Sequence, residues 1–109
     1  MATTYKVLAQ AAPDATTETA VYTVPAATSA IISTMIITNQ STSSGAFRIS
    51  VRLNGEALSQ KNYIAYDTPI SANDSINLTL GITLSAGDII TTYCSSANMS
   101  VSIFGSEIA

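Results

Sequence analysis

The sequence predicts an all-β protein, a single antiparallel β-sandwich or jelly-roll-like domain of about seven or eight short strands. Three observations predict this class. Apolar and polar residues alternate with a period of two in several segments, β-branched residues are abundant throughout, and turn residues separate the segments. The length of 109 residues leaves room for one hydrophobic core and not for two.

The clearest alternation lies in residues 46–53. Four apolar side chains fall on one face of this segment, and two arginines, Arg48 and Arg52, fall on the other. Residues 76–80 and 99–103 alternate in the same way. Each of these segments is therefore predicted to form a strand with one dry face and one polar face.

Two further segments, residues 30–38 and 89–94, are apolar on both faces. Their side chains are Ile31, Met35 and Ile37 opposite Ile32 and Ile36 in the first segment, and Ile89 and Tyr93 opposite Ile90 and Cys94 in the second. A strand that is buried on both faces, or that lies at a subunit contact, has this pattern. We expect the five isoleucine and methionine positions of the first segment, with Ile89 and Tyr93, to form the core and part of an oligomer interface.

The pair Asn54-Gly55 gives the strongest turn signal. Both residues tolerate a positive φ, which a two-residue type I′ turn requires. This pair predicts a hairpin from residues 46–53 into residues 56–58, and residues 59–64 allow one turn of helix.

The domain boundaries follow from the same pattern. Residues 1–17 are polar and turn-rich, and we expect them to form either an N-terminal arm that docks on a partner or the first edge strand. Residues 18–109 are expected to form the sandwich itself.

Charge and hydropathy limit the kinds of partner that the chain is expected to bind. Charged residues make up only 10% of the chain, against about 25% in an ordinary soluble domain, while apolar residues make up 47%. This balance favours a surface partly covered by other subunits. A net charge of −3 with four basic residues leaves no basic patch for nucleic acid. No apolar run is long enough to span a bilayer, and no secretory signal opens the chain, so synthesis in the cytoplasm is expected.

The chain contains few residues of the types that usually catalyse reactions or bind metals. Histidine is absent, which removes the commonest general base and metal ligand, and the one cysteine, Cys94, cannot form an internal disulfide. The seven acidic residues are scattered, and the glycines are isolated turn residues. We therefore expect no enzymatic activity, no metal and no cofactor.

Tyr63 and Tyr66 form the one aromatic cluster of the sequence. Tyrosines spaced this closely suit a protein interface or a core, and they also suit a platform on which a sugar or a base stacks. These two residues are the candidates for ligand binding.

Six short runs between residue 19 and the end of the chain carry a resemblance to a known group of proteins. They are VYTVP at residues 21–25, IISTMIITN at 31–39, FRISVR at 47–52, YIAYDTPI at 63–70, LSAGDII at 84–90 and SIFGSE at 102–107. Together they resemble small virion structural proteins of tailed bacteriophages, marine and cyanobacterial phages among them. The LSAGDII run also resembles a late strand entry in trimeric jelly rolls of the tumour-necrosis-factor and complement-C1q kind.

The resemblance implies a non-enzymatic virion subunit made in the host bacterial cytoplasm, either capsid decoration (cement) or another virion accessory protein. Its partners would be copies of itself, with a trimer favoured, and other virion proteins such as the major capsid or tail proteins. The alternative is a module at a tail fibre or neck that binds a host-surface carbohydrate or receptor.

Overall fold

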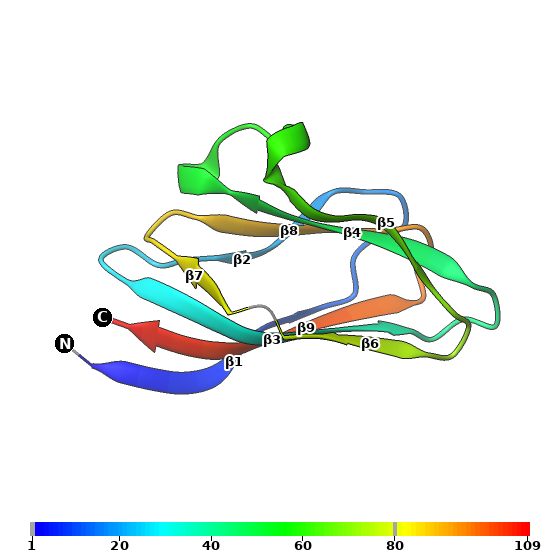
Figure 1. Cartoon of the computed structure of the whole chain (residues 1–109), viewed down its shortest axis with the longest axis horizontal. Helices are drawn as coiled ribbons and strands as arrows, with labels where there is room; N and C mark the ends of the chain where they lie inside the picture. Colours follow the sequence, from blue (N-terminus) through cyan, green and yellow to red (C-terminus); the bar gives the residue numbers. More distant parts are fainter. Residues whose placement is uncertain (1, 80) are drawn as a thin grey trace.

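Two antiparallel sheets pack face to face in the computed structural model (Figure 1), which confirms the predicted all-β sandwich. The structure describes residues 2–79 and 81–109. These residues form nine strands, slightly more than the sequence predicted.

The first sheet contains five strands. In spatial order they are β1 (Thr3–Ala11), β9 (Met99–Ile108), β3 (Ser29–Asn39) and β6 (Ser75–Leu78), with β7 (Ile82–Leu84) pairing beside β6 on the same edge of β3. The second sheet contains four strands, in the order β2 (Thr19–Thr23), β8 (Ile89–Cys94), β4 (Gly45–Arg52) and β5 (Tyr63–Ile70). Between β1 and β2 the chain crosses from the first sheet to the second.

The inner faces of the two sheets form one hydrophobic core. Its largest fully buried side chains are Phe47, Ile32, Met35, Ile37, Ile49, Ile70, Leu84, Ile90, Met99, Ile103, Val24 and Val101. Each such side chain contributes about 1.5–3 kcal/mol through the removal of apolar surface from water. The core therefore draws on both sheets, as period-two strands with one dry face require.

The alternation along β3 differs from the prediction. Ile31 was expected on the same side as Met35 and Ile37, but it lies on the outer face, whereas Ile32 is buried with them. The reason is a β-bulge between Ile32 and Thr34, which inserts one extra residue and reverses the faces on either side of it. Ile36 keeps its predicted place opposite Met35 and Ile37, on the outer face.

The predicted hairpin at Asn54-Gly55 is only partly right. Both residues have positive φ, 51° and 70°, but the chain forms a short 3-10 turn there (Leu53–Gly55) and no strand over residues 56–58. Long-range contacts hold the turn: the backbone N–H of Asn54 donates to Asp88 Oδ1 at 2.9 Å. The partner strand of β4 begins later, after a second 3-10 turn at Gln60–Asn62, within the region expected to allow one turn of helix.

The short strands expected at about residues 5–10 and 19–24 appear as β1 and β2, whereas two other strands lie where the sequence predicted none. β5 carries Pro69 and a positive φ at Asp67, features that weaken a strand signal, and β7 is only three residues long. The expected strand at residues 76–80 appears as β6, although Leu80 lies outside the described residues, as does Met1 of the expected N-terminal segment.

One polar link joins the two sheets near the end of β9. The hydroxyl of Tyr22, on β2, donates to Glu107 Oε2 at 2.6 Å, and Lys6 Nζ lies 2.6 Å from Glu107 Oε1. The hydrogen bonds from Lys6 and Tyr22 lower the pKa of Glu107, while burial and the Glu107 carboxylate raise the pKa of Tyr22. The charge of Lys6 is thus neutralised within its own subunit.

Gly105 was expected to be a turn residue, but it lies within β9 and fixes the spacing of the first sheet. A Cβ atom at this position would overlap the backbone carbonyl of Ile31 and would also touch Cα of Ile32 at 3.1 Å. Both neighbours of β9 carry a bulge close to this point, between Val7 and Ala9 on β1 and between Ile32 and Thr34 on β3. The close approach of the β3 backbone therefore requires a residue without a side chain.

Replacement of Gly105 by alanine is expected to lower the free energy of unfolding by about 2–3 kcal/mol, because the added methyl group overpacks backbone that cannot move freely. Urea denaturation measures this change. The matched control, Ser102→Ala on the same strand, is expected to stay within about 0.5 kcal/mol of the parent protein. Equal stabilities for the two variants would contradict the close packing.

Candidate functional site

The side chains most suited to binding lie on the outer face of the second sheet. Tyr63 and Tyr66 come from β5, Arg48 from β4 and Tyr93 from β8, and Glu18 immediately precedes β2. We call these five residues the tyrosine–arginine cluster. The cluster spans all four strands because the antiparallel register places Arg48 directly beside Tyr93 and because the Tyr63 hydroxyl reaches Glu18.

Arg48 is the centre of the cluster. Its guanidinium carbon lies 4.2 Å from the ring centroid of Tyr66 and 4.3 Å from that of Tyr93. Its Nε donates to Asp67 Oδ1 at 2.6 Å and its Nη2 to Oδ2 at 3.3 Å, a bidentate pair that raises the pKa of Arg48. Two aromatic rings and one carboxylate therefore hold the guanidinium in one orientation.

Tyr63 connects β5 to the opposite edge of the sheet. Its hydroxyl donates to Glu18 Oε2 at 2.7 Å, and this hydrogen bond raises the pKa of Tyr63. Arg48 Nη1 lies 3.8 Å from the same carboxylate oxygen, while the other oxygen, Glu18 Oε1, is buried without a hydrogen-bond partner in the structure. The rings of Tyr63 and Tyr66 meet edge to face, with centroids 4.9 Å apart and planes at 86°.

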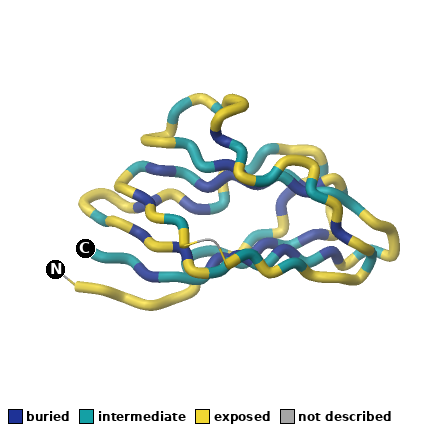
Figure 2. Tube along the Cα trace, in the orientation of Figure 1, coloured by how far each residue is buried: buried dark blue, intermediate teal, exposed yellow. Residues whose placement is uncertain are grey.

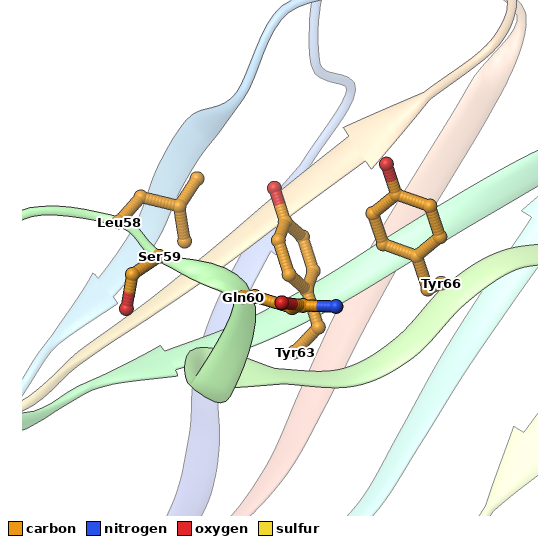
Figure 3. Close-up of a pocket in the computed structure, with 5 residues that line it drawn as sticks. All are labelled: Leu58, Ser59, Gln60, Tyr63 and Tyr66. Carbon is orange, nitrogen blue, oxygen red and sulfur yellow. The ribbon is translucent and has the colours of Figure 1, made fainter.

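The two tyrosines border an open pocket of about 710 Å³. Leu58, Ser59 and Gln60 complete the lining. Figure 3 shows both rings rising from β5 with their hydroxyl ends pointing the same way, and Leu58 on the side of Tyr63 away from Tyr66. The lining holds no charged side chain, so the pocket presents aromatic, aliphatic, amide and hydroxyl groups.

Local hydrogen bonds position the loop that closes this pocket. The backbone N–H of Ser59 donates to Asn62 Oδ1 at 2.8 Å, and Asn62 Nδ2 donates to the carbonyl of Val51 at 3.0 Å and to Glu56 Oε2 at 3.0 Å. These bonds form a capping box at the 3-10 turn and tie it to β4. The loop is therefore anchored on the same strand that carries Arg48.

The chemistry available to the cluster is stacking and hydrogen bonding. Cys94 is fully buried, and burial raises the pKa of its thiol to about 11, which keeps it protonated at neutral pH. Asp67 is engaged by Arg48, and the described residues contain no group of three or more potential metal ligands. Within the described part of the chain, no helix is long and apolar enough to cross a membrane.

A second candidate surface is the outer face of the first sheet. Its strands carry two charged residues, Lys6 and Glu107, and both engage each other on the inner side. The register places apolar side chains together on the outer side, among serines and threonines. They are Tyr5, Val7, Ile31, Ile36, Phe104 and Ile108. We call this surface the uncharged face; it is most exposed along β1, where Tyr5 is 83% and Val7 50% exposed (Figure 2).

The structure brings some of the sequence candidates together and separates others. The rings of Tyr63 and Tyr66 lie against each other, and Tyr93, expected at the core or an interface, lies on Arg48 in the same cluster. Ile32, Met35 and Ile37 are buried in the core, whereas Ile31 and Ile36 lie on the uncharged face, and Ile89 is half-buried on the second sheet. Glu18 was not a sequence candidate, because only the strand order of the second sheet brings it to Tyr63.

Comparison of the chain with protein-family models, with curated proteins and with solved structures gave no match.

Proposed function

We propose that the chain is a non-enzymatic structural subunit that assembles with copies of itself in a phage virion, as capsid decoration or cement or as another virion accessory protein. The uncharged face is the observation that carries this proposal. A whole outer sheet face without a charged side chain, with Tyr5, Val7 and Ile31 exposed, is unusual for a surface that faces only water.

The physical argument rests on desolvation. Charged residues are depleted where protein surfaces meet, because a buried charge without a partner costs several kcal/mol. The serines and threonines of the uncharged face accept or donate hydrogen bonds at a smaller desolvation cost. A second sheet can therefore pack on this face with little electrostatic penalty.

The phage context comes from the resemblance of the sequence runs to small virion proteins. That resemblance favours a trimer and predicts contacts with a major capsid or tail protein. The number of copies in each purified particle distinguishes the two locations: hundreds of copies indicate capsid decoration, and a few dozen or fewer indicate the tail, neck or a fibre.

Self-association is expected to depend on the uncharged face. Val7→Glu introduces a charge there and is expected to weaken assembly at least about tenfold, or 1.4 kcal/mol, as measured by sedimentation equilibrium. Ile64→Glu is the matched control, since Ile64 on the second sheet is 49% exposed and Val7 is 50% exposed. A parent protein that stays monomeric, or an equal effect of both variants, would contradict the proposed function.

The pocket beside Tyr63 and Tyr66 favours a second candidate, a module that binds a host-surface carbohydrate. Its volume lies in the range of ligand sites, and its lining combines aromatic rings with amide and hydroxyl groups and no charge. Tyr66 remains 57% exposed beside this pocket. A neutral sugar could stack on such a ring and exchange hydrogen bonds with Ser59 and Gln60.

The carbohydrate candidate predicts a hit on a glycan array that Tyr66→Ala weakens at least about tenfold, through loss of the stacking surface. Leu53→Ala is the control, because Leu53 is an exposed apolar residue that does not line the pocket. An array without a hit, or binding that survives both Tyr63→Ala and Tyr66→Ala, would rule this candidate out.

A further inference from the structure

The free edge of β1 is the longest unprotected strand edge among the described residues. β1 is the terminal strand of the first sheet and pairs only with β9, so one side of its backbone has no strand partner. The strand is nine residues long and contains no proline, and its first five residues, 3–7, are exposed and precede its own bulge between Val7 and Ala9. An edge of this kind is a template for pairing with another strand.

The direction of the free backbone groups follows from the β1–β9 ladder. Ala2 and Ala109 exchange both of their backbone hydrogen bonds, each at 2.9 Å. Because hydrogen-bonded and non-hydrogen-bonded pairs alternate in an antiparallel ladder, Thr4 and Lys6 also bond to β9. The N–H and C=O groups of Thr3, Tyr5 and Val7 therefore point away from β9, toward the open edge.

The other sheet edges are less suited to pairing. β5 carries Pro69, a positive φ at Asp67 and two register shifts against β4. β2, β6 and β7 have five, four and three residues, and β2 has a register shift of its own. Proline, bulges and shortness are the usual means by which natural proteins protect an edge. The strand that best matches the free edge of β1 in length and shape is β1 of a second copy.

Charge also permits this match. Lysine on an edge strand normally opposes pairing, but the ammonium group of Lys6 is bound by Glu107 of its own subunit, 2.6 Å away. In an antiparallel pair centred on Tyr5, Lys6 faces Thr4 of the second copy and not the second Lys6. The two Lys6 side chains therefore do not face each other across the contact.

We infer that β1 pairs antiparallel with β1 of a second copy, about a twofold axis at Tyr5, and joins two first sheets into one continuous sheet. Tyr5 pairs with Tyr5 of the second copy, and Thr3 pairs with Val7. The inference rests on the proposed self-association and adds to the face contact proposed above an edge contact along β1. It produces assemblies with an even number of subunits, either a dimer or two rings joined across twofold axes.

Cysteine cross-linking tests the contact and its register. Cα atoms of a hydrogen-bonded antiparallel pair lie about 5.5 Å apart, within disulfide range. Under oxidation Tyr5→Cys is expected to give a cross-linked dimer. Val7→Cys is the matched control, because two residues 7 would lie roughly 14 Å apart, four residues out of register. Cross-linking of Val7→Cys but not of Tyr5→Cys, or of neither, would overturn the pairing.

A second pair of variants separates the backbone contact from the side chain. Tyr5→Pro removes an outward N–H without removing a bond to β9, and is expected to weaken assembly at least about tenfold. Tyr5→Thr keeps the N–H and is expected to assemble more tightly than Tyr5→Pro. If the parent protein assembles but Tyr5→Pro assembles equally well, the β1 contact is wrong and the proposed function stands. If the parent protein is monomeric, both fail. If Tyr5→Pro fails to fold, the cross-linking test still decides, because Tyr5→Cys and Val7→Cys change only exposed side chains.

Discussion

The close contact between Gly105 and the backbone of Ile31 is the constraint on which the surface of the protein depends. It brings β3 against β9 at a point where both neighbours of β9 carry an extra residue. The bulge in β3 moves Ile31 out of the core and places it in register with Ser106 and Tyr5. Without that shift, regular alternation would bury Ile31 beside Met35 and Ile37. The bulge beside this backbone contact therefore adds Ile31 to the apolar side chains of the uncharged face.

The two outer faces of the sandwich divide the polar chemistry between them. The second sheet holds Arg48 between two tyrosines and against Asp67, an arrangement that fixes side chains in place and leaves an open pocket at their side. The first sheet directs its two charged residues, Lys6 and Glu107, inward, where they pair with each other and Glu107 also accepts a hydrogen bond from Tyr22 of the opposite sheet. The outer face of the second sheet thus carries charged and aromatic side chains held in fixed orientations. The outer face of the first sheet carries uncharged side chains that can be buried at a small cost. This contrast supports a subunit that packs through one sheet and keeps the other available.

Period-two patterning was sufficient to predict the sandwich, because β4 buries Phe47 and Ile49 and β9 buries Met99, Val101 and Ile103, which are alternate positions along each strand. It was not sufficient at Ile31, since a bulge depends on the neighbouring strand and not on local sequence. The turn at Asn54-Gly55 was predicted correctly in its positive φ values but not in its hairpin, because the side chain of Asp88, far along the chain, binds the turn. Tyr63 and Tyr66 were found from their spacing. The places of Glu18 and Tyr93 beside Arg48 could not be predicted from the sequence, because only the strand order of the second sheet brings them there.

Amide hydrogen exchange in the assembled protein tests the central claim, which is that the subunits meet along β1. The account predicts that the amides of Tyr5 and Val7 exchange slowly in the assembly and rapidly after dilution to the monomer. The amides of Thr4 and Lys6, which bond to β9, should be slow in both states. Rapid exchange of Tyr5 and Val7 in an assembly that remains intact would contradict the account.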